Sequence, residues 1–75
     1  MKEVLEVIAK SLVEKPDEVN VTEIVNDDST TLELRVADGD MGKVIGKQGR
    51  IANAIRVVMR AAATRQEKNI SVEID

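Results

Sequence analysis

Two glycines three residues apart, Gly46 and Gly49, enclose Lys47 and Gln48 within a segment that otherwise favours helix. A glycine inside a helix costs about 1 kcal/mol relative to alanine, so the pair needs a structural or functional reason. Glycine has no Cβ, so its main chain can approach a sugar-phosphate backbone closely. Lysine adds a charge, glutamine adds amide donors, and a helix that begins here adds free N–H groups. The tetrapeptide therefore predicts a loop that holds the backbone of a single-stranded nucleic acid.

Two other interpretations of the glycine segment compete with this one. A tight turn between two helices also places glycine where one helix ends and the next begins. A nucleotide phosphate loop needs Gly, four residues and then Gly-Lys-Ser/Thr. Here three residues separate Gly42 from Gly46, and Gln48 follows Lys47, so the spacing and the magnesium-binding hydroxyl are both wrong. The nucleic-acid loop and the plain turn remain.

The charges of the chain are segregated along its length. The 75 residues carry a formal net charge of −3. Residues 1–41 contain four basic and eleven acidic side chains, whereas residues 42–68 contain seven basic side chains and one acid, Glu67. An anionic ligand responds to the local field more than to net charge, so the basic segment favours a nucleic-acid ligand. A charged helix that is merely solvated is the alternative.

The composition excludes several classes of chemistry. There is no cysteine and no histidine, so disulfides, thiolate chemistry, ordinary zinc sites and the commonest general base are absent. The pairs Asp27/Asp28 and Asp38/Asp40 lie in turn-like sequence, where Asp is expected for turns and caps. We expect no enzyme, no metal and no cofactor. No apolar run approaches the ~20 residues of a membrane span and no signal peptide is recognised, so we expect one cytoplasmic domain over residues 1–75.

Hydrophobic periodicity predicts the elements of the first half of the chain. Apolar residues at helical spacing predict a helix over residues 2–14, ended by Lys15-Pro16. Residues 18–25 alternate and then lose phase near Glu23, which predicts a bulged strand. Residues 26–29 form a turn by composition, and residues 30–37 alternate cleanly as a strand with one buried face.

The second half is predicted to be helical until a final strand. Asp40 is expected to cap a short helix at 41–45, and residues 66–69 form a loop before a strand at 70–74. A longer helix at 50–65 should bury one stripe of residues, namely Ile51, Ile55, Val58, Met59 and Ala62. The order α-β-β-α-α-β predicts an α+β fold whose first two strands form a hairpin and whose last strand runs parallel to its neighbour.

This element order and the segment GKVIGKQGRIANAI resemble the type II KH domain, and in detail a small bacterial RNA-binding protein that consists of one KH domain and little else. The GXXG motif of the family matches residues 46–49, and the match covers essentially the whole chain. The resemblance implies a three-stranded mixed sheet covered on one face by three helices. It also implies single-stranded RNA bound about four nucleotides at a time, with backbone contacts at the GXXG loop. The candidate RNA-binding residues are Lys43, Ile45, Gly46, Lys47, Gln48, Gly49, Arg50, Asn53 and Arg56.

Two features predict weak binding of broad specificity. Many KH domains have Ile or Val three residues after the second glycine, where this chain has Ala52. The chain also has no Phe, Tyr or Trp on which bases could stack. We therefore expect binding driven by phosphate contacts and sensitive to salt. Single-stranded DNA remains an alternative ligand, and a protein-interaction adaptor that no longer binds RNA remains an alternative function.

The long helix also suggests a protein partner. Ala54, Val57 and Ala61 form an apolar flank beside the main stripe, although scattered apolar surface residues are normal. Linking two weak modules raises apparent affinity without new contacts in either module. The resemblance implies a homodimer, a heterodimer with a larger KH-domain protein, or both. It implies the role of an RNA chaperone or post-transcriptional regulator.

Overall fold

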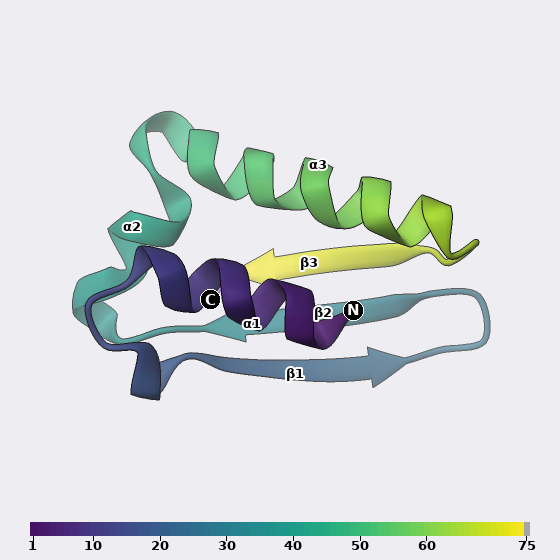
Figure 1. The fold of residues 1–75 in the computed structure, drawn as a ribbon, viewed down its shortest axis with the longest axis horizontal. Coiled ribbons are helices and arrows are strands. Elements are labelled where there is room, and N and C mark those ends of the chain that lie inside the picture. The colour runs from purple at the N-terminus through teal and green to yellow at the C-terminus, as the bar shows by residue number, and fades with distance from the viewer. Residues whose placement is uncertain (75) are drawn as a thin grey trace.

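The predicted order of elements is confirmed. A computed structural model describes residues 1–74 (Figure 1). Three short 3-10 turns lie at Pro16–Glu18, Asp38–Asp40 and Lys47–Gly49. The helices and strands are α1 (Lys2–Leu12), β1 (Asn20–Val25), β2 (Thr30–Arg35), α2 (Met41–Ile45), α3 (Arg50–Arg65) and β3 (Ile70–Ile74).

The sheet has the strand order β1-β2-β3 and is mixed, as expected. β1 and β2 form an antiparallel hairpin, and β3 runs parallel to β2 because α2 and α3 return the chain to the same end of the sheet. The predicted bulge in β1 is wrong, since its register with β2 is unbroken from Asn20 to Val25. The loss of the apolar/polar alternation near Glu23 has another cause. Glu23 and Val25 share the face of buried Val21 but are exposed, because the helices leave that end of β1 uncovered.

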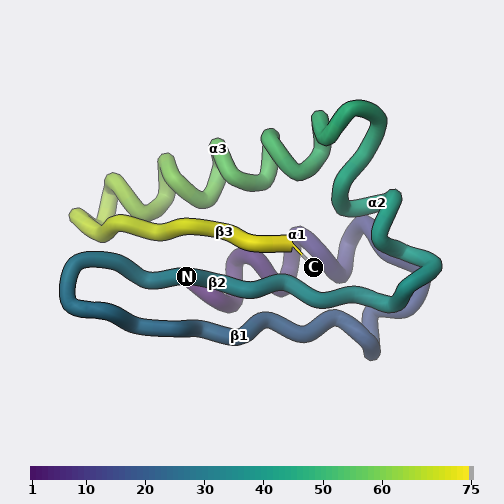
Figure 2. The backbone as a smooth tube through the Cα atoms, turned by 180° about the vertical axis from the view of Figure 1, so that it is seen from behind, coloured from purple at the N-terminus to yellow at the C-terminus, as the bar shows by residue number. Residues whose placement is uncertain are grey.

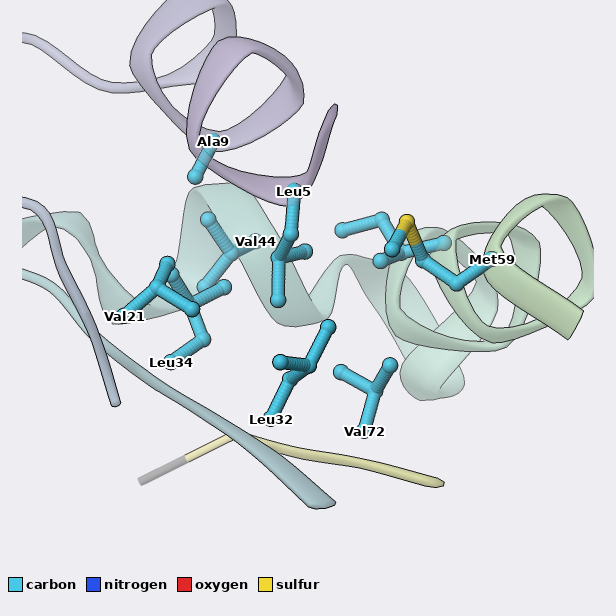
Figure 3. Packing of buried hydrophobic residues seen from close by; sticks show 9 residues of the cluster. Leu5, Ala9, Val21, Leu32, Leu34, Val44, Met59 and Val72 are labelled. Carbon is cyan, nitrogen blue, oxygen red and sulfur yellow. The ribbon is translucent and has the colours of Figure 1, made fainter. Parts of the chain in front are cut away.

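The helices lie on one face of the sheet and leave the other open, which is the predicted arrangement. Figure 2 shows the sheet from the open side, with α1 behind it. The core lies between these layers, where α1, α2 and α3 meet the inward side chains of the strands (Figure 3). Its members are Leu5, Ala9, Val21, Leu32, Leu34, Val44, Ile55, Met59 and Val72. Each large aliphatic side chain buried in this way stabilises the fold by about 1.5–3 kcal/mol.

The buried stripe of α3 is rotated from the predicted one. Ile55 and Met59 are buried as expected, but Val58 is 50% exposed, and Ala52 and Ala63 are buried in its place. Alanine side chains are short, so they let α3 approach its neighbours closely, and α3 packs more on β3 and α2 than on α1. The rotation turns Val58 away from the core, toward the surface between α3 and α1.

Asp40 precedes α2 as predicted, but its carboxylate does not cap that helix. It is 3% exposed and accepts hydrogen bonds from the backbone N–H groups of Glu14 (3.3 Å) and Lys15 (3.0 Å). These bonds help explain why α1 ends at Leu12, before the expected Lys15-Pro16 boundary. Burial raises the pKa of Asp40, but the two N–H donors and the Lys43 ammonium outweigh burial and hold it below its usual value.

Asp40→Asn is therefore expected to lower the melting temperature at pH 7. A carboxylate whose folded pKa is depressed stabilises the fold above its unfolded pKa, about 3.9, and loses that effect as pH falls through the folded value. The difference in melting temperature between wild type and variant should shrink below about pH 4, measured by circular dichroism. Asp38→Asn is the control, because Asp38 is exposed. A difference that stays constant with pH would show that the charge of Asp40 is not what stabilises the fold.

Candidate nucleic-acid interface

The GXXG loop, residues 46–49, is a sharp turn between α2 and α3. Gly46, Gln48 and Gly49 all have positive φ, at 76°, 59° and 74°. The Gly46 N–H donates to the Gly42 carbonyl at 2.9 Å, and the Gly49 N–H donates to the Gly46 carbonyl at 3.2 Å. A Cβ added at Gly46 would lie 2.6 Å from Cγ1 of Ile51, whereas one at Gly49 would meet nothing within 4 Å. At position 46, both the positive φ and the lack of room for a Cβ therefore require glycine. At position 49, only the positive φ favours it.

The turn presents a compact set of donors. Lys47 and Gln48 are exposed at its tip, and Arg50 is exposed in the first turn of α3. The Arg50 guanidinium donates to Gln48 Oε1 at 3.4 Å. No side chain caps the N-terminus of α3, so the positive end of the helix dipole also faces the loop. The structure thus brings three of the predicted residues together in a site suited to a phosphate group.

Ile45 connects the loop to the core. Val44, one residue earlier, is fully buried, and Ile45 is partly buried and packs against the core cluster. α2 is only five residues long, so these two side chains fix the position from which the loop leaves. Ile45, predicted as a groove wall, is thus also an anchor of the loop.

Lys43 lies in α2 before the loop, and its ammonium group is already paired with carboxylates. Its ammonium lies 3.4 Å from Glu14 Oε1 and 3.6 Å from Asp40 Oδ1. Its side chain is 41% exposed. Because two carboxylates share this charge, Lys43 adds less than Lys47 to the positive field at the loop.

Asn53 and Arg56 lie further along α3. Asn53 is exposed, whereas Arg56 is half-buried and donates from Nε to the Val72 carbonyl of β3 at 3.3 Å. Arg56 lines a cleft of about 310 Å³ between α3 and β3, which we call the β3 cleft. The sequence prediction left Arg60 out of the site, although Arg60 lines the same cleft. Its position four residues after Arg56, one helical turn away, is the signal that could have found it.

A second, apolar groove adjoins the loop on the other side of α3. This α1/α3 groove has a volume of about 450 Å³. It is lined by Ile8, Leu12, Arg50, Ile51, Ala54, Ile55 and Val58. The predicted flank at Ala54, Val57 and Ala61 is exposed beside it. Apolar side chains therefore gather on the surface at this groove.

Two classes of site receive no support from the described part of the chain. Within residues 1–74, no three Asp, Glu, His or Cys side chains lie close enough to hold a metal ion. A search of the same residues for a helix with the length and hydropathy needed to cross a bilayer finds none.

Comparisons with known proteins identify the family of this chain. The sequence model of the KhpA/KhpB KH domain matches residues 2–74. The RNA-binding protein KhpA of Clostridium perfringens is 60% identical and that of Clostridium acetobutylicum is 62% identical, each over 99% of both chains. The RNA-binding protein KhpA of Aquifex aeolicus is 45% identical over 99% of this chain and 94% of its own. No solved structure gives a significant match.

The names of these relatives describe binding and not catalysis, in agreement with the expectation that the chain is not an enzyme. The family match spans nearly every residue, and it includes the GXXG loop and all the elements around it. The chain therefore belongs to the KhpA/KhpB family of KH domains.

Proposed function

We propose that residues 1–75 act as a single KH domain that binds single-stranded RNA and holds the RNA backbone at the GXXG loop. The observation that carries the proposal is the geometry of that loop. Gly46 and Gly49 hold Lys47 and Gln48 at an exposed tip, beside Arg50 and the uncapped N-terminus of α3. The names of the relatives support RNA as the ligand.

The proposed binding is weak and broad in sequence preference. Phosphate contacts fix position but carry no sequence information. The chain offers no aromatic side chain for base stacking, and Ala52 is 5% exposed, so it presents little surface to a base. Lys43, Ile45, Asn53 and Arg56 flank the loop and supplement it. These properties suit a cytoplasmic RNA chaperone or post-transcriptional regulator.

The salt dependence of binding tests the loop directly. We expect Lys47→Gln to weaken binding of a fluorescent single-stranded RNA pool and to reduce the slope of log K against log salt by about 0.7, the value for one phosphate contact on a single strand. Lys68→Gln removes the same charge from the loop between α3 and β3, at the other end of α3 (Figure 1), and should leave the slope unchanged. Fluorescence anisotropy at several salt concentrations measures both.

The outcomes separate the remaining functions. If both lysine variants lose affinity equally, diffuse charge and not the loop carries binding. If wild type binds no RNA while folded, the protein-interaction adaptor is the better proposal. DNA of the same sequence tests the other nucleic acid, because a backbone contact alone does not require the 2′-hydroxyl.

We further propose that the chain self-associates or pairs with a larger KH-domain protein through the flank of Ala54, Val57 and Ala61. Val57 is 62% exposed and lies beside the apolar α1/α3 groove, and contiguous exposed apolar surface marks sites of interaction. Val57→Glu is expected to raise the dissociation constant of a homodimer by about 10-fold or more, because it places a charge in a desolvated contact. Sedimentation gives the apparent mass as a function of concentration.

Asn20→Glu is the matched control for Val57→Glu. It adds the same charge on exposed β1, opposite Arg35 in the sheet register and away from α3. Self-association that survives Val57→Glu unchanged would exclude this flank as the interface.

A further inference from the structure

β1 is an outer strand of the sheet, and its backbone is paired on one side only. The strand order β1-β2-β3 gives β1 a single neighbour, and Figures 1 and 2 both show it at the lower margin of the sheet. The Asn26 N–H donates to the Ser29 carbonyl at 2.8 Å, directly after the last pair of the register. Hydrogen-bonded pairs alternate along an antiparallel ladder, so every second residue before Asn26 faces β2. The residues whose N–H and C=O groups point outward are Val21, Glu23 and Val25.

This edge lacks the features that usually keep an outer strand from pairing. Proline, lysine, a bulge or a covering helix commonly blocks such an edge. β1 reads NVTEIV, with neither proline nor lysine, and its register with β2 is unbroken over six residues. The opposite edge of the sheet differs, because the Arg56 guanidinium donates to the Val72 carbonyl of β3 at 3.3 Å. The edge of β1 is therefore the one that is ready to accept a further strand.

The chain around this edge is acidic. Residues 16–34, which contain β1 and β2, carry six acidic side chains and no basic one. The basic residues that flank this range are Lys15, whose ammonium lies 3.9 Å from Glu18 Oε2, and Arg35, which pairs with Asn20 at the start of β1. The other end of β1 has Glu23 exposed on the side of the sheet that the helices leave uncovered. Charge complementarity at this end favours a basic partner.

A long basic side chain has room beside Glu23. A hollow of about 420 Å³ lies at this end of β1, and Val25, which is 70% exposed, forms part of its wall. The charged residues that line it are Glu23, Asp27, Asp28, Glu67 and Lys68. Within residues 1–74, no three acidic side chains lie close enough together to hold a metal ion. The aliphatic stem of a lysine or arginine can instead lie along Val25 while its charge meets the carboxylates.

A second copy of this chain does not suit the edge. Two β1 strands paired antiparallel about Glu23 would place the two Glu23 carboxylates directly opposite each other, and such like-charge pairs are destabilising. The same pairing brings the acidic turn at residues 26–29 of each copy toward Asp17 and Glu18 of the other. Repulsion at all three places disfavours self-pairing and leaves the edge to a strand of opposite charge.

We propose that the open edge of β1 binds an extended basic segment of another protein, which joins the sheet as a fourth strand and places a lysine or arginine beside Glu23. Main-chain hydrogen bonds to the outward groups of β1 supply affinity in this mode of recognition, and alternate side chains supply specificity. The inference goes beyond the proposed RNA binding and does not rest on it, because β1 and the GXXG loop are different parts of the fold.

A six-residue peptide of alternating lysine and valine is the probe. Its length matches β1, and alternation places all its lysines on one face of the added strand. A peptide of alternating glutamate and valine is the control of opposite charge. Fluorescence anisotropy with labelled peptides gives both dissociation constants. We expect the lysine peptide to bind about 10-fold or more tightly than the glutamate peptide.

Hydrogen exchange of the β1 amides distinguishes an added strand from diffuse attraction between charges. Thr22 and Ile24 already face β2, whereas Val21, Glu23 and Val25 have outward N–H groups. Saturating lysine peptide should slow exchange at the three outward amides by about 10-fold or more and should slow it much less at Thr22 and Ile24. Nuclear magnetic resonance resolves each amide separately.

Three variants separate the backbone contact from the charge. Glu23→Pro removes an outward N–H and no bond to β2, so an outer strand tolerates it, and binding of the lysine peptide should weaken by about 10-fold or more. Glu23→Gln keeps that N–H and removes the charge, and should weaken binding by about 2-fold to 5-fold. Glu73→Gln makes the same charge change on exposed β3, at the opposite edge, and should leave the dissociation constant unchanged.

Failure of Glu23→Pro to fold does not weaken the test. Circular dichroism checks the fold, and a lysine peptide that is N-methylated at every residue replaces the variant if needed. This peptide keeps its charges but has no N–H donors, so it should bind wild type about 10-fold or more weakly than the unmodified lysine peptide.

Four results overturn the proposal. A lysine peptide that does not bind would leave Glu23 only the role of blocking edge-to-edge pairing. Equal binding of the lysine and glutamate peptides would remove the charge argument. Equal slowing at all β1 amides, or unchanged binding by folded Glu23→Pro and by the methylated peptide, would exclude an added strand. Slowing at the outward amides that rises with protein concentration in the absence of peptide would give the edge to a second copy instead.

Discussion

Lys47→Asp combined with Gln48→Asp is expected to lower affinity for single-stranded RNA by about 100-fold or more. The two exposed side chains stand at the tip of the GXXG loop, where the proposed phosphate lies. The change replaces a cation and an amide with two carboxylates, and like charges brought together at an interface cost several kcal/mol. A loss of about 2.8 kcal/mol corresponds to 100-fold in the dissociation constant.

The same double change should not weaken the fold. Gln48 has a left-handed backbone conformation, which Asp adopts more readily than Gln. Both new carboxylates precede α3, where negative charge is favourable to the helix dipole. The melting temperature by circular dichroism should therefore equal or exceed that of wild type, so any loss of RNA binding reports on the loop itself.

Gln66→Asp combined with Lys68→Asp is the matched control. It replaces the same two residue types and changes net charge equally, at the opposite end of α3. At physiological salt, charges separated by more than about 8 Å are largely screened, so the control should bind RNA nearly as well as wild type. If both double variants lose affinity to the same degree, the overall charge of the protein and not the GXXG loop would be responsible.

The elements were predictable from the sequence because each depends on local pattern. Apolar and polar residues alternate in β2 and β3, and apolar residues recur at helical spacing in α1 and α3, because each element buries one face. The structure has these elements in the predicted order. The GXXG loop was also predictable, since its glycines and flanking charges are contiguous. Its φ values show why Gly46 and Gly49 occur there.

Features that depend on distant residues were not predictable. The carboxylate of Asp40 accepts hydrogen bonds from the backbone N–H groups of Glu14 and Lys15, which are 26 and 25 residues away. No local sequence pattern distinguishes that role from a helix cap. The rotation of α3, which exposes Val58 and buries Ala52, follows from how closely α3 can approach β3 and α2. Arg60 became a candidate only when β3 supplied the other wall of its cleft.

Gly46→Ala is expected to lower the free energy of unfolding by about 2–5 kcal/mol. The positive φ accounts for about 1–2 kcal/mol of this loss, and the steric contact of the new Cβ with Ile51 accounts for about 1–3 kcal/mol. A domain of 75 residues has roughly 4–11 kcal/mol in total. The change should therefore remove much of its stability, and RNA binding with it. Urea unfolding followed by far-ultraviolet circular dichroism is the suitable measurement, because the chain has no Trp or Tyr.

Two neighbouring glycines separate the steric effect from the conformational one. Gly49→Ala shares the positive φ but has open space around its Cβ, so it should cost only about 1–2 kcal/mol. Gly42→Ala lies in α2 with open space and no positive φ, so it should stabilise the fold by about 0.5–1 kcal/mol. If Gly46→Ala and Gly49→Ala cost the same, Ile51 moves aside freely.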